Sequence, residues 1–127
     1  MDYPGDRLYT PDHEWITVDG DVARVGITSY AAQALGDVVY LDLPEVGTVV
    51  TAGESCGEIE STKSVSDLVA PADGEVLGHN EAAVDAPETV NTDPFGDGWL
   101  YTMRVGAVPE DLLDAETYAA LVTGEGA

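Results

Sequence analysis

The chain has 127 residues, the size of one domain. Its 25 aspartates and glutamates outnumber its 4 lysines and arginines, which gives a formal charge of −21. A nucleic-acid interface is excluded because it needs a basic stripe that this chain cannot build, and binding to an anionic membrane is disfavoured for the same reason.

A disordered acidic chain is also excluded, because hydrophobic residues make up 44% of the sequence, as in ordinary folded domains. We therefore predict a folded domain with an acidic surface. Such a surface repels itself, and dissolved salt screens the repulsion. The composition thus predicts a protein from a halophile, in which the cytoplasm has a high salt concentration.

Three features indicate a cytoplasmic protein. Cys56 is the single cysteine, so no intrachain disulfide can form. No apolar run approaches the length of a membrane helix. The first ten residues lack the basic and apolar segments of a signal peptide.

The N-terminal third predicts a hairpin and then a short helix. Asp19-Gly20 lies between two β-rich runs and is typical of tight hairpin turns. Thr28 is a suitable N-cap for the helix, and Gly36 can end it. The expected elements are strands over 14–18 and 22–27 and a helix over 29–35.

The middle of the chain predicts short strands, and its end predicts a helix. Pro109 and the acids after it suit a first helical turn, and apolar residues at helical spacing follow. Residues 124–127 are expected to fray. The strands are expected over 37–43, 49–51, 55–60, 65–69, 75–78 and 98–105, and the C-terminal helix over 109–123.

An internal repeat links two of these strand pairs. Pro44 and Gly47 recur as Pro71 and Gly74, at an offset of 27 residues, and aliphatic residues follow each glycine. Each copy runs strand, turn, strand. Two such copies predict a pseudosymmetric sandwich or flattened barrel of short strands.

Lys63 is the only lysine, and the pattern places it at the polar tip of a hairpin. A hairpin tip exposes a side chain on a rigid base. Composition alone leaves open a solvated or charge-balancing lysine. A primary amine can also form a Schiff base or carry an amide-linked group. The wet, acidic tip favours the amide, because Schiff-base catalysis needs a desolvated amine with a lowered pKa.

The residues around this lysine resemble the glycine cleavage system H-protein family. The resemblance covers residues 8 to 122, and its most specific part is the run around Lys63. The matching blocks are His13-Glu14-Trp15, Val25-Gly26-Ile27-Thr28, Gly36-Asp37-Val38-Val39-Tyr40, Leu43-Pro44-Glu45-Val46-Gly47, Gly57-Glu58-Ile59-Glu60-Ser61-Thr62-Lys63-Ser64-Val65-Ser66-Asp67, Asp93-Pro94-Phe95 and Gly98-Trp99-Leu100.

The resemblance implies a mostly β fold, the lipoyl/biotinyl hybrid-motif sandwich or flattened barrel, with a short internal helix and a C-terminal helix. It implies a single lipoyl-carrier domain over 1–127. The hybrid motif would occupy about 36–105, the N-terminal hairpin and helix 8–35, and the C-terminal helix 109–123.

The resemblance also implies a function, with lipoic acid attached covalently to Lys63 by a lipoyl-attaching enzyme. A pyridoxal-phosphate glycine decarboxylase would pass an aminomethyl group to the arm, and a tetrahydrofolate-dependent aminomethyltransferase would remove it. Dihydrolipoamide dehydrogenase would then reoxidise the arm. The protein itself would be a carrier in glycine catabolism and a substrate of these enzymes, not an enzyme.

In the family the loaded arm can fold back onto the carrier. By that resemblance, Glu14 and Asp67 are expected to hold the amine end of the arm, because a carboxylate pairs with an ammonium group. Ile27 and Ser64 are expected to line the cleft. Ala34 departs from the pattern, since some family members carry a polar or charged residue at this position.

Other functions stay open at this point. The chain could be a lipoyl relay, a lipoyl domain of a 2-oxo acid dehydrogenase, or an unmodified acidic interaction module. A biotin carrier fits less well, because neither neighbour of Lys63 is methionine.

Five further side chains are expected to have structural or surface roles. Cys56 is predicted to be a small buried residue. His13 and His79 lack the spacing of metal ligands and are predicted to be structural or at the surface. Trp15 and Trp99 are predicted to pack in or at the rim of the core.

Overall fold

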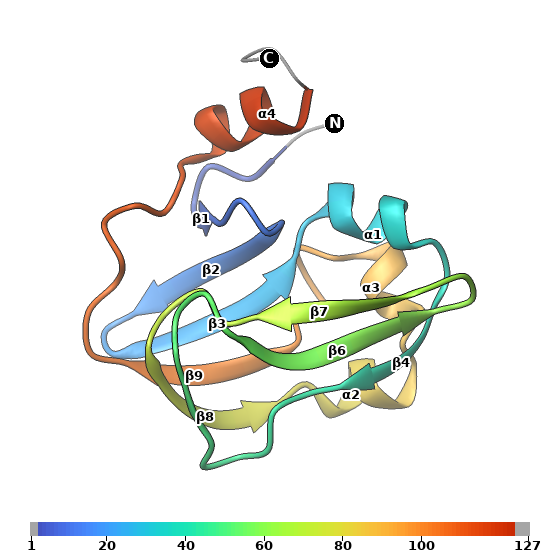
Figure 1. The fold of residues 1–127 in the computed structure, drawn as a ribbon, viewed down its shortest axis with the longest axis horizontal. Coiled ribbons are helices and arrows are strands. Elements are labelled where there is room, and N and C mark those ends of the chain that lie inside the picture. Colours follow the sequence, from blue (N-terminus) through green and yellow to red (C-terminus); the bar gives the residue numbers. More distant parts are fainter. Residues whose placement is uncertain (1–2, 124–127) are drawn as a thin grey trace.

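The structure is a computed structural model that describes residues 3–123, so the predicted fraying of 124–127 lies outside the described residues (Figure 1). Two antiparallel sheets face each other. One has six strands in the order β1-β2-β3-β9-β8-β5, and the other has three in the order β4-β6-β7. The strands are β1 (Leu8–Tyr9), β2 (Glu14–Asp19), β3 (Val22–Ile27), β4 (Val38–Asp42), β5 (Val49–Val50), β6 (Ser55–Ser61), β7 (Val65–Val69), β8 (Gly74–His79) and β9 (Tyr101–Val105). The helices are α1 (Ser29–Leu35), α2 (Glu81–Asp85), α3 (Thr89–Thr92) and α4 (Ala115–Thr123).

The predicted hairpin is confirmed. Asp19 pairs with Val22 across the turn, and Gly20 takes a φ of 66°, which glycine adopts without steric cost. β3 also pairs with β9 along its other edge, so the hairpin extends the sheet formed by the later strands.

The predicted helix after the hairpin is confirmed as α1, with its expected ends. The Ala31 N–H donates to the Thr28 Oγ1 at 3.2 Å, so the threonine caps the helix. Gly36 closes it with a φ of 80°, and its N–H donates to the Ala32 carbonyl. The short chain from β3 through α1 to β4 therefore has a defined course.

The repeat divides its two copies between the sheets. Moving β4 by 27 residues along the chain gives β7, and these strands flank β6 on its two sides. The second strands, β5 and β8, pair with each other in the larger sheet. The repeat therefore corresponds to two crossings from one sheet to the other, as expected for the predicted pseudosymmetric sandwich.

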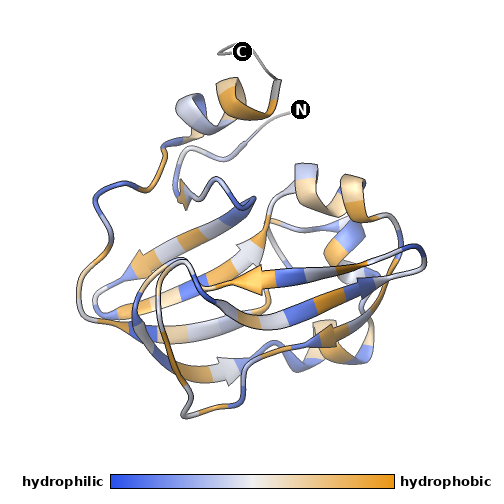
Figure 2. Cartoon of the chain, viewed as in Figure 1, coloured by the Kyte–Doolittle hydropathy of each residue, from blue (hydrophilic) through white to orange (hydrophobic). Residues whose placement is uncertain are grey.

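The core lies between the sheets, as the alternating hydropathy of the strands indicates (Figure 2). Leu41, Ile59 and Leu68 contribute from the smaller sheet, and Val25 and Val76 contribute from the larger one. All five are at most 4% exposed. Burial of these side chains supplies the main driving force for folding.

The predicted C-terminal helix over 109–123 is wrong at its start, since α4 begins at Ala115. Leu113 instead exchanges two backbone hydrogen bonds with Tyr9, at 2.8 and 2.7 Å, which holds this segment extended. Asp114 then accepts from the Thr117 N–H and caps the helix. α4 and β1 thus lie side by side at one end of the molecule (Figure 1).

Other boundaries also differ from the sequence prediction. α2, α3 and β1 were not expected, because elements of two to five residues carry too little periodicity. The last strand begins at Tyr101, since Gly98 belongs to the turns after α3, where its N–H donates to the Asp93 carbonyl.

Trp15 packs across the hairpin against Gly26, so a substitution at this glycine tests the packing of the region. A Cβ built at Gly26 would lie 2.5 Å from the Trp15 ring, whose Nε1 is anchored by donating to the Pro94 carbonyl. We expect Gly26→Ala to lower the free energy of unfolding by about 1–3 kcal/mol, the usual cost of overpacking. Urea denaturation measures this loss. Gly106→Ala is the control, because nothing lies within 4 Å of its Cβ; equal losses for the two variants would contradict the packing argument.

Candidate functional site

The hairpin between β6 and β7 presents Lys63 at a rigid tip. Ser61 organises the turn: its Oγ accepts from the backbone N–H groups of Lys63 and Ser64, at 3.4 and 3.1 Å. Its own N–H donates to the Ser64 carbonyl at 2.8 Å. The Thr62 N–H donates to the Asp37 carbonyl, which ties the tip to the start of β4. The lysine is therefore exposed on a fixed turn, as predicted.

Lys63 lies across the end of α1. A Cβ built at Gly36 would lie 3.4 Å from the Lys63 Cε and 4.0 Å from its Nζ. Asn91 on α3 braces this place by donating to the Gly36 carbonyl at 2.7 Å and accepting from the Val38 N–H at 2.9 Å. A glycine here leaves room for the lysine stem, and the asparagine fixes the backbone beneath it.

A pocket of about 270 Å³ opens beside the tip, between α1, the start of β2 and the edge strand β7. Lys63 does not line it, but its neighbour Ser64 does. The pocket brings together all four side chains that the sequence analysis assigned to the arm. Its lining residues are Asp12, His13, Glu14, Ile27, Tyr30, Ala31, Ala34, Leu35, Ile59, Ser64, Val65, Ser66 and Asp67.

Glu14 is the buried acid of this pocket, with only 1% of its surface exposed. Its Oε2 accepts from the Val69 N–H at 2.7 Å, and the Thr10 hydroxyl lies 3.5 Å from its Oε1. Burial raises the pKa of the Glu14 carboxyl to about 8, although the Val69 N–H opposes the rise. Near neutral pH the pocket therefore holds mainly a protonated carboxyl group.

The backbone around Glu14 explains why this side chain is buried. Glu14 is the first residue of β2 and pairs with Ile27, which is 3% exposed, at the end of β3. The Thr10 hydroxyl accepts from the N–H groups of Asp12 and Glu14, so the loop between β1 and β2 folds back on itself. The carboxyl is thereby carried inward to β7.

Asp67 differs from Glu14, because it is exposed on the edge strand β7, opposite Glu58 of β6. Ser64 is also exposed. Ile27 supplies buried apolar surface. Ala34 lines the pocket without any polar group, so the departure from the family pattern lies within the site. The pocket combines an apolar wall, a buried acid and an exposed acid.

His13 also lines the pocket, a placement that the sequence analysis did not predict. Its backbone has a φ of 70°, which is unusual for a residue other than glycine. Its ring lies 4.7 Å from the ring of Tyr30. Burial lowers the pKa of the His13 imidazole, while Asp12 opposes the shift. Its place directly before Glu14 in a family block was the only available signal.

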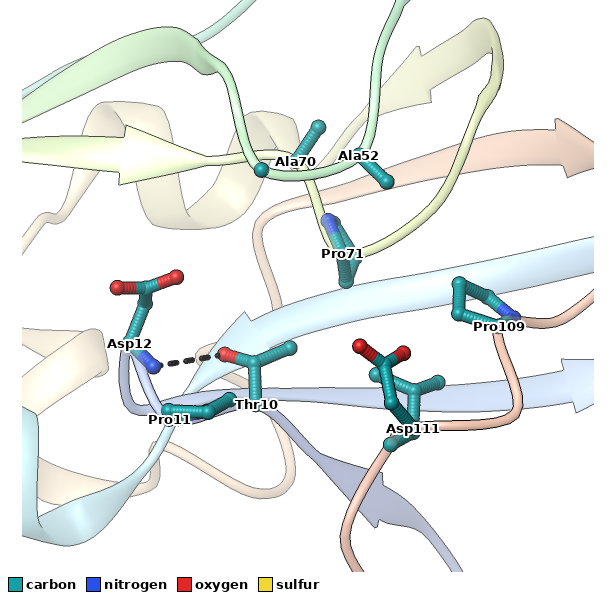
Figure 3. A pocket seen from close by; sticks show the side chains of 10 residues that line it. Thr10, Pro11, Asp12, Ala52, Ala70, Pro71, Pro109 and Asp111 are labelled. Carbon is teal, nitrogen blue, oxygen red and sulfur yellow. Dashed lines mark hydrogen bonds between the residues drawn. The ribbon is translucent and has the colours of Figure 1, made fainter.

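A second pocket, of about 200 Å³, adjoins the first, and Asp12 lines both. Figure 3 shows Asp12 and Asp111 on the side of the cavity facing Ala52, Ala70 and Pro71. The hollow therefore continues past the first pocket toward the end of β7 that lies away from the hairpin tip.

The remaining predicted side chains have structural contacts. Cys56 is half-buried, with its Sγ 3.7 Å from the Tyr101 hydroxyl, and burial raises the pKa of its thiol. His79 lies 2.5 Å from the Pro44 carbonyl through its Nε2. Trp15 is fully buried, and Trp99 is half-buried beneath the Arg24 guanidinium. These packing roles agree with the sequence prediction, although Cys56 is less buried than expected.

Two further features concern residues 3–123. No three of their His, Cys, Asp and Glu side chains gather as metal ligands. None of their helices is long and apolar enough to cross a membrane.

The chain is similar in sequence to known proteins. A model of the glycine cleavage H-protein family matches residues 7–125. The chain belongs to the glycine cleavage H-protein family. The glycine cleavage system H protein of Beutenbergia cavernae is 60% identical over 125 residues, which span 98% of this chain and 100% of that protein. The glycine cleavage system H protein of Thermobifida fusca is 55% identical over 126 residues, which span 99% and 100%.

A solved structure extends the H-protein relationship to the fold. The crystal structure of a glycine cleavage system H protein from Mycobacterium marinum matches with a TM-score of 0.88 and 56% sequence identity, covering 98% of this chain and 100% of that chain. The predicted fold, a mostly β two-sheet sandwich with a short internal helix and a C-terminal helix, is thus confirmed.

The buried acid predicts how stability depends on pH. Glu14 ionises near its ordinary pKa of 4.5 in the unfolded chain but near about 8 in the folded one, so folding binds a proton between these values. The stability of the wild type therefore falls as pH rises through this window, by at most a few kcal/mol, at about 1.4 kcal/mol per pKa unit. Glu14→Gln cannot ionise and lacks this fall.

Urea denaturation of both chains from pH 5 to pH 9 checks this expectation. The free energy of unfolding of Glu14→Gln should rise steadily relative to that of the wild type up to about pH 8. Glu45→Gln, at an exposed glutamate, is the matched control and should run parallel to the wild type. A constant difference between Glu14→Gln and the wild type would contradict the raised pKa.

Proposed function

We propose that this protein, residues 1–127 acting as one carrier domain, is the lipoyl carrier of a glycine cleavage system, with lipoic acid amide-linked to Lys63. The observation that carries the proposal is the placement of the chain's only lysine at an exposed, hydrogen-bonded hairpin tip beside a pocket that holds a buried acid. Membership of the H-protein family supports it.

The residues fit the attached group. The exposed Lys63 amine is accessible for amide formation, which removes its charge and makes the carrier one unit more negative. When bound, the dithiolane supplies the redox and group-carrying chemistry, whereas the protein supplies position and recognition. Attachment to a rigid tip gives the group a high local concentration at each partner's active site.

The pocket provides a place where the loaded arm can rest. Ile27 offers an apolar wall, and Ser64 and Asp67 lie at the exposed side. Glu14 can give its proton to an arriving amine, which leaves a carboxylate beside an ammonium group. The ion pair thus forms inside the pocket from a neutral amine and a neutral acid. No isolated ion has to leave water, which avoids a large desolvation cost.

The proposed partners follow from this role. A pyridoxal-phosphate glycine decarboxylase loads the carrier, and a tetrahydrofolate-dependent aminomethyltransferase unloads it. Dihydrolipoamide dehydrogenase reoxidises it, and a lipoyl-attaching enzyme modifies Lys63. The protein is thus a cytoplasmic carrier and a substrate of these enzymes.

The proposed attachment site makes a direct prediction. Protein purified from its own source should exceed the mass of the bare chain by one lipoyl group, with the modification on Lys63. Lys63→Arg keeps the positive charge but has no primary amine, so it should stay unmodified and lose essentially all glycine–bicarbonate exchange with purified decarboxylase. Intact mass and exchange of labelled bicarbonate measure these outcomes.

The outcomes separate the competing functions. Native protein without the added mass would favour an unmodified interaction module. Modified protein without exchange would favour a lipoyl relay or a dehydrogenase lipoyl domain. Exchange retained by Lys63→Arg would refute the assigned site. Arg24→Lys, which adds an exposed amine in β3, is the control and should stay unmodified at residue 24.

We also propose that the acidic surface suits a salty cytoplasm, as in a halophile. The ion pairs of residues 3–123 involve Asp6, Asp21 and Glu75, so most of the 25 acids lack a cationic partner. Salt shortens the Debye length from about 10 Å at 0.1 M to about 3 Å at 1 M. We expect the melting temperature to rise by about 5 °C or more over this range of KCl, by scanning calorimetry. An unchanged midpoint would count against salt adaptation.

A further inference from the structure

One buried hydroxyl group contacts two residues beside the pocket between α1, β2 and β7, which we call the arm pocket. The Tyr118 hydroxyl on α4 is 2.8 Å from the His13 Nδ1 and 2.8 Å from the Thr28 Oγ1. Tyr118 is fully buried and does not line the pocket itself. Its hydroxyl therefore acts on the pocket only through these two neighbours.

The two neighbours belong to different elements. His13 lines the pocket from the loop before β2, next to Glu14. Thr28 is the N-cap of α1, and Tyr30 and Ala31 at the start of that helix also line the pocket. The same threonine Oγ1 accepts from the Ala31 N–H and contacts the Tyr118 hydroxyl. The hydroxyl thus links the His13 imidazole to the N-cap side chain, beside a direct backbone bond from the Thr28 N–H to the His13 carbonyl at 3.0 Å.

The position of the hydroxyl is itself fixed from outside the pocket. The Tyr118 ring stacks on Tyr9, with centroids 4.9 Å apart and planes at 13°. Tyr3 packs edge-on against Tyr118 at 5.0 Å. Tyr9 is also held by backbone hydrogen bonds to Leu113, just before α4. The aromatic contacts remain if only the hydroxyl is removed.

His13 depends on such a partner. Its φ of 70° lies in a region that residues other than glycine seldom occupy, so surrounding contacts must keep it there. The bond at Nδ1 fixes the rotation of the imidazole, which keeps its ring in contact with that of Tyr30, with 4.7 Å between the ring centroids.

We propose that Tyr118 is a positioning residue for the arm pocket, because its hydroxyl holds the His13 imidazole in the orientation against α1 that shields the loaded arm from water. The C-terminal helix thereby takes part in the carrier function without touching the arm. This inference rests on the proposed function, in which the loaded arm occupies the pocket.

The first readout needs no lipoyl group. In the unmodified full-length chain, Tyr118→Phe removes the hydroxyl and keeps the ring. The ¹⁵N resonances of the His13 ring should shift, while those of His79, the other histidine, stay unchanged as an internal reference. Tyr9→Phe is the matched control: it removes the Tyr9 hydroxyl bond to the Pro4 carbonyl and should leave the His13 resonances in place.

The second readout uses the lipoylated carrier loaded by glycine decarboxylase. Water breaks the bond between sulfur and the aminomethyl carbon, giving a free thiol, formaldehyde and ammonia, and formaldehyde is measured over time. Tyr118→Phe should speed this loss by about 2- to 10-fold, the factor that one neutral hydrogen bond supplies. Tyr9→Phe should match the wild type. His13→Gly tolerates the positive φ and removes the imidazole that the hydroxyl contacts, so formaldehyde release from this variant provides the test if Tyr118→Phe does not fold.

Unshifted His13 resonances in Tyr118→Phe, or formaldehyde release at the wild-type rate, would overturn the inference. Shifted His13 resonances in Tyr118→Phe, together with faster release in both Tyr118→Phe and His13→Gly and no further effect in the double variant, would support it. If native protein carries no lipoyl group, the proposed function fails, and the His13 resonances alone still decide whether the hydroxyl positions the pocket wall.

Discussion

The hydrogen bond from the Val69 N–H to the buried Glu14 carboxyl is the contact on which the site depends. It joins the larger sheet to the edge strand of the smaller one, at the place where the pocket opens. A buried carboxyl needs hydrogen-bond partners, so the Thr10 loop and β7 must both come to it. The same burial raises the pKa of Glu14 to about 8. One constraint therefore shapes the pocket and raises the pKa of its acid.

The charge of the molecule separates two roles. The acidic surface concerns the solvent around the protein, since most of its carboxyl groups are exposed to water. Two side chains do not belong to this acidic surface. Lys63 is the only lysine and lies on an exposed tip, and Glu14 is an acid that is buried away from water. Ser64, the neighbour of Lys63, lines the pocket together with Glu14, whereas Lys63 itself does not line it. A tethered group can therefore move between a partner and a sheltered position.

The features predicted well from the sequence were those with strong local signals. Asp19-Gly20, the Thr28 cap and the glycine after α1 specify their turns by backbone chemistry, and the run around Lys63 is specific enough to indicate the family. The helix start at Ala115 was not predictable, because it depends on the long-range bridge between Leu113 and Tyr9. His13 was missed for the same reason. Its role comes from a positive φ and a contact with Tyr118, 105 residues away in the sequence. Burial of Glu14 likewise follows from the meeting of two sheets, whereas the sequence shows one acid among 25.

The central claim is that Glu14 receives the amine of the loaded arm inside the pocket. The most direct measurement is an NMR titration of ¹³C-carboxyl-labelled glutamate in the unloaded and the loaded carrier, with Glu14→Gln used to assign the Glu14 signal. The account predicts a Glu14 pKa near about 8 in the unloaded protein and a marked fall on loading, because the ammonium group stabilises the carboxylate. An identical titration in the two states would contradict it.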